Sequence, residues 1–502
     1  MVGAQSYCSI LDHRNRTGVD FHEYAEIKIK NMDLHQKNIL IVGLGISGMA
    51  SARFAKNKGG IVTITDIAKE DALAGYLPEV RKIDVRTELG GHNTETFENA
   101  DLIIVSPGVP HTILPIERAK EKGIPVLGEI ELASRYIREP IVAISGTNGK
   151  TTTTRLLGHM MKNSGFNVFV GGNIGNPLID YACREKTADI VVAEVSSFQL
   201  DTIDTFRPRV SVLLNISADH LDRYPDFESY VRSKGRIFKN QAEGDTAVIN
   251  GSDPSISLIS KTLRTRVLPF YHQDNFHTKN REYAIISRRN GQNAPMINIF
   301  TKEDPKGFFD LSQVDLLGRH NMENVAAAAL AALAAGGTLE GIQSALNDFK
   351  GLSHRLEFVK IINGVHFYDD SKGTNIDAVA RALEVFDKPV VLIMGGRDKG
   401  GDFKQLRELV KQHTKKLIVM GEAGNVIKSV LGDSCQEGAQ NASTMENAVS
   451  LAYLAASPGD VVLLSPGCSS FDMYSSYAER GEVFCKAVEN LENSDRNITH
   501  GQ

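Results

Sequence analysis

The segment that most constrains this chain is IVAISGTNGKTTTTRLL, residues 141–157. An apolar strand runs into a glycine-bracketed turn that ends in Lys150, and a helical pattern follows. Backbone N–H groups of such a turn, the positive end of the new helix and the lysine ammonium bind phosphate oxygens together. The segment therefore predicts a nucleoside triphosphate site with contacts from seven consecutive residues, which are Gly146, Thr147, Asn148, Gly149, Lys150, Thr151 and Thr152.

Within this turn, Thr151 is placed to bind Mg²⁺ through its hydroxyl group. The strict phosphate-loop pattern requires a glycine six positions before the lysine, where this chain has Ile144. The alternative interpretation is an ordinary connection between a strand and a helix. The sequence Lys-Thr-Thr directly after such a turn favours the phosphate site.

Composition limits the class of protein. A chain of 502 residues is too long for one hydrophobic core and predicts about three domains. A formal net charge of -5 disfavours nonspecific binding to nucleic acid. The longest apolar run, residues 325–335, is too short to cross a bilayer, so we expect no membrane insertion. Five scattered cysteines indicate neither a disulfide framework nor a zinc site and fit a reducing cytoplasm.

The order of strand and helix patterns predicts an α/β protein of three domains in series. We expect a polar N-terminal extension and then three domains: Rossmann-like, central and phosphate-loop ATPase-like, and again Rossmann-like. The predicted ranges are 1–36, 37–138, 139–350 and 351–502. The polar stretch from about Asp253 to Lys306 predicts an insertion of antiparallel strands in the central domain.

The first domain contains a second glycine turn. Gly43, Gly45 and Gly48 form G-x-G-x-x-G after a strand, and Asp66 ends the next strand. Taken alone, this spacing indicates NAD. Because a nucleotide site follows downstream, we expect this domain to bind the diphosphate and sugar of a nucleotide-linked substrate, through Gly45, Ile46, Ser47, Asp66 and Ser106. The alternative is that the glycines only permit a tight turn.

Two polar positions follow strands of the central domain. Glu194 ends the strand pattern ADIVVAEV, and the next strand leads to ISADHLDRY, which brings Asp219 and His220 to the same sheet edge. A carboxylate beside a phosphate turn is expected to bind a metal ion. His220 is a candidate for a second metal or for a substrate carboxylate. A lone histidine is more often structural.

Eight motifs in this order resemble the Mur ligases of bacterial cell-wall synthesis: GTNGKTT, GGNIGNP, EVSSFQL, DHLDRY, GRHNMENVAAA, SHRLEF, DDSKGTN and SPGCSSFDMYSSYAERG. The match covers roughly residues 37–490. The resemblance implies a cytoplasmic bacterial enzyme, expected to be a monomer, that uses ATP and two Mg²⁺ ions to add D-glutamate to UDP-N-acetylmuramoyl-L-alanine. It also implies one domain each for the UDP-substrate, for ATP and for the amino acid.

The resemblance assigns further roles. Lys150, Glu194, His220 and Lys234 are the implied catalytic residues, with Thr151, Glu194, His220 and a carbamylated Lys234 as metal ligands. Asn173 and His220 are implied to contact the UDP-substrate. The implied nucleotide contacts outside the turn are Asn321, Asn324, His354, Arg355, Asp370 and Lys372, and the implied D-glutamate contacts are Thr374, Lys399, Ser470, Phe471 and Tyr477.

Some of these positions look ordinary without the resemblance. Lys234 alone indicates a solvated helix lysine, Lys399 a surface charge and Tyr477 a core aromatic residue. Ile67 and Ala68 also depart from the Thr-Arg of some relatives, which affects the uracil and phosphate contacts. The family chemistry is phosphoryl transfer to a carboxylate followed by attack of an amine on the acyl phosphate, with domain closure around the substrates.

Four other classes remain as alternatives. A folylpolyglutamate synthase shares the ATP turn, but it resembles a chain without the glycine-rich first 137 residues. The sister ligase for a diamino acid typically carries Asp-Asn-Pro-Arg where this chain has Gly-Arg-Asp-Lys at residues 396–399. The third and fourth are a nucleotide-gated binding module without chemistry and an NAD-linked oxidoreductase.

Overall fold

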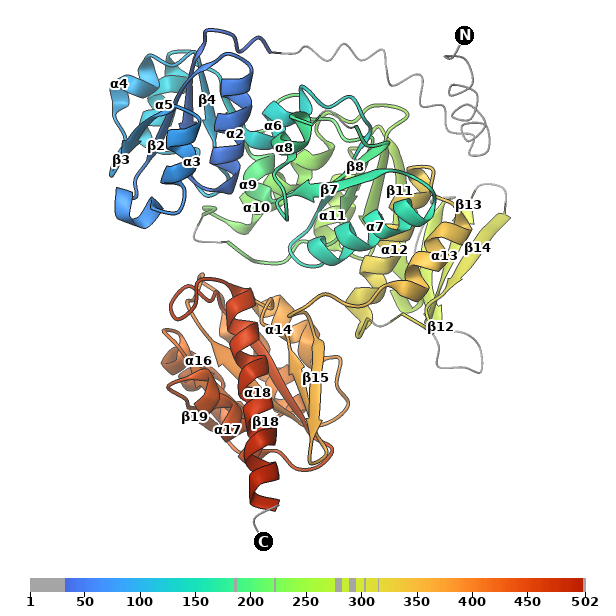
Figure 1. The fold of residues 1–502 in the computed structure, drawn as a ribbon. Helices are drawn as coiled ribbons and strands as arrows, with labels where there is room; N and C mark the ends of the chain where they lie inside the picture. The colour runs from blue at the N-terminus through green and yellow to red at the C-terminus, as the bar shows by residue number, and fades with distance from the viewer. Residues whose placement is uncertain are drawn as a thin grey trace, which may run out of the picture. The chain divides into compact units, whose positions relative to one another are not determined.

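The computed structural model describes residues 32–184, 187–220, 223–275, 282–288, 295–301, 304–314 and 316–499 (Figure 1). The predicted extension therefore lies almost entirely outside the described residues. Among those described, none forms a helix long and apolar enough to cross a membrane. They divide into two compact units, and the second takes residues 217–229, 314–323 and those from 349 onward.

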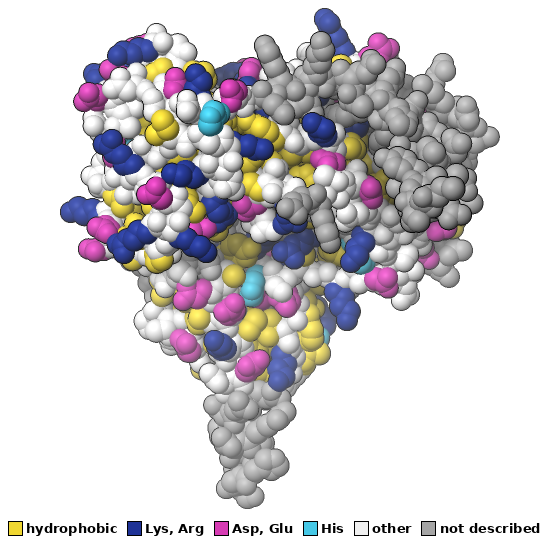
Figure 2. All heavy atoms as spheres, turned by 45° about the horizontal axis from the view of Figure 1, so that its top comes forward, with side chains coloured by type: hydrophobic (Ala, Val, Ile, Leu, Met, Phe, Trp, Pro, Cys, Tyr) yellow, Lys and Arg dark blue, Asp and Glu magenta, His cyan; other side chains and the backbone are white. Residues whose placement is uncertain are grey.

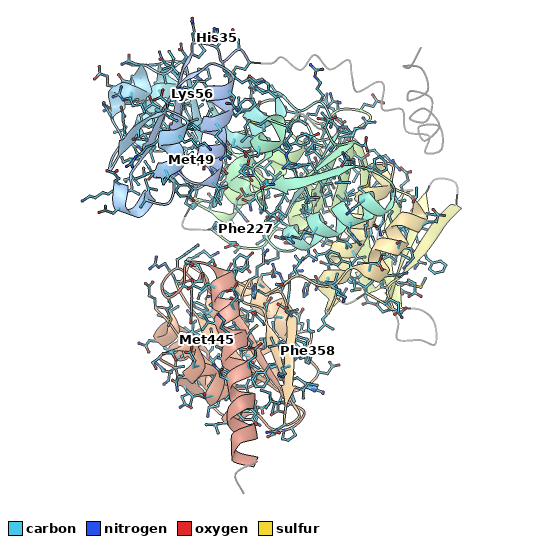
Figure 3. The ribbon with its side chains drawn as sticks, viewed as in Figure 1. His35, Met49, Lys56, Phe227, Phe358 and Met445 are labelled. Carbon is cyan, nitrogen blue, oxygen red and sulfur yellow. The ribbon has the colours of Figure 1, made fainter. Side chains whose placement is uncertain are left out.

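The first sheet of the first unit is parallel throughout. Its strand order is β3 (Arg86–Leu89), β2 (Ile61–Asp66), β1 (Asn38–Val42), β4 (Leu102–Val105) and β5 (Val126–Gly128). The chain order reverses between β1 and β4, where a Rossmann-like sheet binds its ligand. The helices are α2 (Ile46–Asn57), α3 (Leu77–Lys82), α4 (Thr94–Glu98), α5 (Leu114–Glu121) and α6 (Glu129–Ser134), with the 3₁₀ turn η2 (Glu70–Leu73). Met49, labelled on α2 in Figure 3, belongs to the buried core.

The second sheet has nine strands among the described residues. Its order is β14 (Asp304–Asp310), β13 (Pro295–Thr301), β12 (Tyr283–Arg288), β11 (Arg266–His272), β10 (Thr246–Asn250), β9 (Val210–Leu213), β6 (Ile141–Ser145), β8 (Ile190–Glu194) and β7 (Val168–Gly172). The central strands β6 and β8 are buried throughout, as expected for a parallel sheet covered on both faces. Because β6 pairs in parallel with both β8 and β9, the carboxyl ends of these three strands meet at one edge of the sheet.

Helices and short turns complete this part of the chain. They are α7 (Lys150–Asn163), α8 (Leu178–Ala182), α9 (Ser197–Leu200), α10 (Phe227–Gly235), η3 (Arg236–Phe238), α11 (Pro254–Ser260), η4 (Gln273–Asn275), α12 (Arg319–Ala334) and α13 (Leu339–Asp348). Helix α6, which follows the first sheet, packs against α8 (Figure 1). A salt bridge from Arg53 on α2 to Asp180 on α8 adds a second contact, with 3.1 Å between its atoms.

The predicted antiparallel insertion is partly wrong. Strand β11 pairs in parallel with both β10 and β12, and α11 provides the crossover between β10 and β11. Of the strand pairs described in this segment, only β12 to β13 and β13 to β14 are antiparallel. These strands extend the central sheet itself, so the segment continues the doubly wound fold before it turns into a meander.

The second unit contains the third sheet, in the order β15 (Glu357–Ile362), β16 (Val365–Asp369), β20 (Val461–Gly467), β17 (Val390–Gly395), β18 (Thr414–Met420) and β19 (Ala439–Asn441). All pairs are parallel except the β15 to β16 hairpin. Its helices are α14 (Ile376–Leu383), α15 (Arg407–His413), α16 (Gly424–Leu431), α17 (Met445–Ala455) and α18 (Tyr477–Thr499), with the 3₁₀ turns η5 (Phe403–Leu406) and η6 (Gly432–Ser434).

Successive side chains of these strands enter opposite cores. Leu392 on β17 packs in the core under α14, α15 and α16, whereas Ile393 packs in the core under α17 and α18. Met445, labelled in Figure 3, belongs to the second core. Burial on both faces explains why the strands read as continuous apolar runs and confirms the predicted Rossmann-like sheet.

Candidate functional site

The phosphate turn connects β6 to α7 and is held from the neighbouring strand end. Asn215, after β9, accepts the Thr147 N–H through its backbone carbonyl at 2.9 Å and the Asn148 N–H through Oδ1 at 2.8 Å. Gly146 and Gly149 adopt φ values of 156° and 84°, which other residues rarely adopt. A Cβ on Gly149 would lie 2.1 Å from Asn324 Oδ1, so this turn also requires the absence of a side chain.

Two lysines converge on the turn. Lys150 Nζ donates to the carbonyl oxygens of Gly146 and Thr147 at 2.9 and 2.8 Å. Lys234, on α10, is only 1% exposed and donates from Nζ to the same Gly146 oxygen at 2.8 Å. The interpretation of Lys234 as a solvated lysine is therefore wrong. Its ammonium also lies 4.7 Å from the ring centroid of Tyr230, one helical turn earlier.

Glu194 ends β8 beside β6 and is 2% exposed. Its Oε1 accepts a hydrogen bond from Asn173 Nδ2 at 3.0 Å, and its Oε2 is buried with no hydrogen-bond partner among the described residues. An ionised carboxylate buried in this way needs a counter-charge. The carboxylate of Glu194 and the hydroxyl of Thr151, the second residue of α7, are oxygen donors of the kind that Mg²⁺ prefers. These residues therefore fit the ion.

The glycine turn of the first sheet lies at the point where the strand order reverses. Gly43, with φ 99°, accepts a hydrogen bond from Ser106 Oγ after β4 at 2.9 Å. A Cβ on Gly48 would lie 2.0 Å from the Gly43 oxygen, which explains that glycine, whereas Gly45 faces open space at the start of α2. The N–H groups of Ile46 and Ser47 belong to this open helix terminus.

Asp66 fixes the same turn. Its Oδ2 accepts the Leu44 N–H at 2.7 Å and its Oδ1 accepts the Ala68 N–H at 2.8 Å. The carboxylate therefore shapes the turn, and each oxygen retains a further lone pair for a ligand hydroxyl. Ile67, the departure noted in the sequence, is 75% exposed.

In the second unit, a cavity of about 80 Å³ is lined by Thr374, Asn375, Lys399, Asp219 and His220, among others. Lys399 Nζ lies 3.6 Å from Asp219 Oδ1, and Asn375 Nδ2 donates to Asp219 Oδ2 at 3.0 Å. Lys399 has a side chain only 23% exposed, so its interpretation as a plain surface charge is wrong. His220 contributes a strained backbone with φ 56°.

Asp370 follows β16 and is buried. Its Oδ2 accepts the Ser465 hydroxyl at 2.8 Å, Arg355 NH1 lies 4.0 Å from its Oδ1, and that Oδ1 has no hydrogen-bond partner among the described residues. Burial raises the pKa of Asp370 to about 6, although the Arg355 charge opposes this rise. His354 donates from Nδ1 to Asp369 Oδ2 at 2.7 Å, and this hydrogen bond raises the pKa of His354.

The remaining candidates of the second unit come from separate segments of the chain. The ammonium of Lys372 lies 5.1 Å from the ring centroid of Tyr477, which begins α18. Tyr477 is 38% exposed and Phe471 is 65% exposed, so the interpretation of Tyr477 as a core residue is wrong. Ser470 is buried, and Asn321 donates from Nδ2 to the Leu317 oxygen at 2.7 Å.

Each unit thus groups part of the predicted site. The first unit holds the phosphate turn with Asn173, Glu194, Lys234 and Asn324, and also the glycine turn of the first sheet. The second unit holds His220, Asn321, Arg355, Asp370, Lys372, Thr374, Lys399, Ser470, Phe471 and Tyr477. Figure 2 shows basic and acidic side chains interspersed over the visible face.

Sequence reasoning missed three residues of this arrangement, which are Asn215, Tyr230 and Asn375. Asn215 follows a buried strand, and a polar residue at a parallel strand end was a usable signal. Tyr230 lies four residues before Lys234 on the same helix, which places the two side chains together. Asn375 gave no such signal, because its partner Asp219 is distant in sequence. Asp219 itself was expected near His220 but not beside Lys399.

A phosphate-binding turn on the central sheet, with an α/β sheet before it and another after it, defines a multidomain nucleotide-binding α/β protein. Family models match the same order: "Mur ligase MurD-like, N-terminal domain" at residues 37–128, "Mur ligase middle domain" at 144–332 and "Mur ligase, glutamate ligase domain" at 354–468. The chain belongs to the Mur ligase family.

Two relatives named UDP-N-acetylmuramoylalanine--D-glutamate ligase are similar over nearly the whole chain. The protein from Desulfosudis oleivorans is 50% identical over 93% of this chain and 99% of its own length. The protein from Desulfatibacillum aliphaticivorans is 51% identical over 92% of this chain and 100% of its own length.

Solved structures share the fold at low sequence identity. A pseudomurein peptide ligase type C from Methanothermus fervidus aligns with a TM-score of 0.57 and 19% identity, over 91% of this chain and 100% of that chain. MurF ligase from Thermotoga maritima in complex with ADP aligns with a TM-score of 0.56 and 17% identity, over 92% and 96%. The three-domain α/β prediction is confirmed.

Proposed function

We propose that this chain is an ATP-dependent ligase that adds D-glutamate to UDP-N-acetylmuramoyl-L-alanine in the synthesis of cell-wall precursors. The observation that carries the proposal is the phosphate turn with two lysines on one carbonyl and the buried Glu194 carboxylate at the neighbouring strand end. The relatives that are 50% and 51% identical, named for this reaction, support the choice of substrates.

The UDP-substrate is proposed to bind at the glycine turn of the first sheet. The N–H groups of Ile46 and Ser47 at the start of α2 suit a diphosphate, and hydrogen bonds of Ser106 and Asp66 fix the turn before them. Asn173, which reaches Glu194, is proposed to orient the peptide end of this substrate.

ATP is proposed to bind at Gly146 to Thr152, with Asn324 beside the turn. Asn321, Arg355, Asp370 and Lys372 are proposed as contacts to the same nucleotide from the second unit. Thr151, Glu194, His220 and a carbamylated Lys234 would hold two Mg²⁺ ions, which supply charge stabilisation at the transferring phosphoryl group. Carbamylation suits Lys234, because it converts one of two neighbouring ammonium groups into an oxygen-bearing anion.

The reaction follows from the weakness of a carboxylate as an acyl donor. The alanyl carboxylate attacks the γ-phosphate of ATP, the bond to ADP breaks, and an acyl phosphate forms. Lys150 offsets negative charge on the phosphate during this step. The amine of D-glutamate then attacks the acyl carbon, phosphate leaves, and the amine loses its proton. Thr374, Lys399, Ser470, Phe471 and Tyr477 are proposed to hold D-glutamate.

A single assay tests substrate and reaction together. The protein is incubated with UDP-N-acetylmuramoyl-L-alanine, ATP and Mg²⁺, and phosphate release is measured with one amino acid at a time. We expect release with D-glutamate, and much less with L-glutamate, glycine or a diamino acid. Equal release with glycine contradicts the substrate assignment, and absence of release with every amino acid favours the binding module.

We place the domain boundaries near residues 36, 138 and 350. The protein is proposed to be a monomer and to act in the cytoplasm. Domain closure is proposed because candidate nucleotide contacts occur in both units. Small-angle scattering with and without ATP and the UDP-substrate tests closure, and sedimentation tests the monomer.

A further inference from the structure

Glu129 is a buried carboxylate for which the reaction above has no use. It is the first residue of α6, directly after β5, and is 1% exposed. Its Oε1 accepts the Ile179 N–H at 2.7 Å, and its Oε2 has no hydrogen-bond partner within the described part of the chain. A carboxylate buried with so little compensation is costly, so its position calls for a reason.

The first neighbour of Glu129 is Ile179, which connects it to Asn173 through helix α8. Ile179 is the second residue of α8, and the loop before this helix carries Asn173. The loop is fixed by a hydrogen bond from the Gly172 N–H to the Asn176 oxygen at 2.9 Å, and Asn173 N–H donates to the Glu194 backbone oxygen at 2.9 Å. Glu129 therefore holds the helix whose preceding loop presents the Asn173 amide to Glu194.

The second neighbour of Glu129 is Gln199, which lies five residues after Glu194 in the sequence. Gln199 forms a capping box with Ser196, and its Oε1 accepts the Ser196 N–H at 3.0 Å and the Ser196 hydroxyl at 3.1 Å. Gln199 also interacts with the Glu129 carboxylate, and because its own oxygen is occupied it does so through its NH₂ group. Ser196 stands two residues after Glu194, so the capping box fixes the chain just beyond the strand end.

The ionised form of Glu129 holds both neighbours more strongly than the protonated form does. Burial raises the pKa of Glu129 to about 7, the Ile179 and Leu178 N–H groups and the Gln199 side chain oppose the rise, and the charge of Asp180 adds to it. Asp180 lies on α8 and pairs with Arg53 on α2. The ionised carboxylate is the stronger acceptor for these donors, whereas the protonated acid turns one of its oxygens into a donor.

We propose that Glu129 is a positioning residue that links the end of the first sheet to the Asn173 and Glu194 pair, through Ile179 on one side and the Gln199 capping box on the other. It contacts no reacting atom and acts through the orientation of the Glu194 carboxylate. The inference rests on the proposed function, because that function gives Glu194 its role as a metal ligand.

The test compares Glu129→Gln with Glu131→Gln on the same helix. Glu131 is also buried, but it binds the Thr205 hydroxyl at 2.7 Å and the N–H groups of Asp204, Thr205 and Phe206 instead. Two quantities are measured from about pH 6 to about pH 8.5: the Mg²⁺ concentration for half-maximal turnover, and the rise in Tm caused by Mg²⁺ with a non-hydrolysable ATP analogue.

We expect Glu129→Gln to raise the half-saturating Mg²⁺ concentration about tenfold at the higher pH and to reduce the rise in Tm. The wild type is expected to change in the same direction as the pH falls through about 7, and the variant to show no such change. Glu131→Gln is expected to lower Tm without changing the Mg²⁺ requirement.

An unchanged Mg²⁺ requirement in Glu129→Gln, or an equal change in both variants, overturns the inference. Persistence of the wild-type pH dependence in Glu129→Gln overturns it as well. If the wild type releases no phosphate in response to D-glutamate, the proposed function fails separately, and the Tm measurement still decides whether Glu129 affects binding of Mg²⁺ with the nucleotide.

Discussion

Lys150 and Lys234 donate to the same acceptor, the carbonyl oxygen of Gly146, over 2.9 and 2.8 Å. They come from different helices, and Lys234 is almost completely buried. Two ammonium groups on one carbonyl repel each other in a region of low dielectric. Phosphate groups bound at the turn, or conversion of one lysine into an anion, would relieve this repulsion.

Replacement of Lys234 by Met is expected to reduce turnover about 100-fold or more, because the carbamate oxygen proposed for metal binding is lost. Met fills the buried space, so Tm is expected to remain close to that of the wild type. Turnover of the wild type is also expected to fall in buffer depleted of carbon dioxide and to recover with bicarbonate. Full activity of Lys234→Met would exclude the carbamate.

Replacement of Lys150 by Ala is expected to abolish ATP-dependent phosphate release, because the lysine is proposed to offset charge on the γ-phosphate. The matched control is Lys162→Ala, in the exposed last turn of the same helix α7. We expect the control to retain wild-type kcat and KM for ATP. Equal loss in both variants points to damage of the helix and not to phosphate binding.

Local patterns made much of this site predictable. The phosphate turn and the first glycine turn are runs of neighbouring residues. A positive φ requires glycine at Gly43, Gly146 and Gly149, and contact with the Gly43 oxygen requires it at Gly48. The burial of Lys234 and the exposure of Tyr477 depend on packing between distant segments, so single positions gave the wrong environment. The pairing of Asp219 with Lys399 joins residues 180 positions apart in sequence, and no local pattern reports such a contact.

The prediction of antiparallel pairing for the strands after Asp253 was partly wrong for a different reason. An apolar strand pattern does not state whether its partner runs parallel, and the polar connections around β12 resembled those of a meander. Helix α11 is short, with seven residues, and it provides the crossover that makes β11 parallel to β10. A weak helix signal was therefore the feature on which the topology depended.

Substitution of Gly149 by Ala separates backbone strain from steric contact at the phosphate turn. Both Gly149 and Gly165 have positive φ, 84° and 93°, but only a Cβ on Gly149 meets an atom within 4 Å, namely Asn324 Oδ1 at 2.1 Å. Each substitution is expected to cost about 1–2 kcal/mol of stability from strain. Only Gly149→Ala is expected to weaken binding of an ATP analogue, measured by calorimetry.

Replacement of Lys399 by Ala is expected to raise KM for D-glutamate about 10- to 100-fold, because a hydrogen bond to a charged group contributes about 1.5–3 kcal/mol. KM for ATP is expected to change little. Lys411→Ala, at an exposed position on α15, is the control and is expected to leave both constants unchanged. An effect on KM for ATP alone contradicts the amino-acid pocket.

Asp370→Asn tests whether a costly buried acid is retained for binding. Its folded-state pKa of about 6 lies above the ordinary value of 3.8, so the folded protein is stabilised by protonation, and this stability is present below about pH 4 and lost as the pH rises through 6. Asparagine carries no charge at any of these pH values, so the variant does not lose this stability as the pH rises. We therefore expect the free energy of unfolding of the variant to rise by up to about 2–3 kcal/mol at pH 8 and by little at pH 4, measured by chemical denaturation.

The same variant is expected to have a higher KM for ATP and therefore a lower kcat/KM, because the Asp370 carboxylate is the proposed contact. A variant with unchanged KM and no gain in stability would show that Arg355, 4.0 Å away, already compensates the charge.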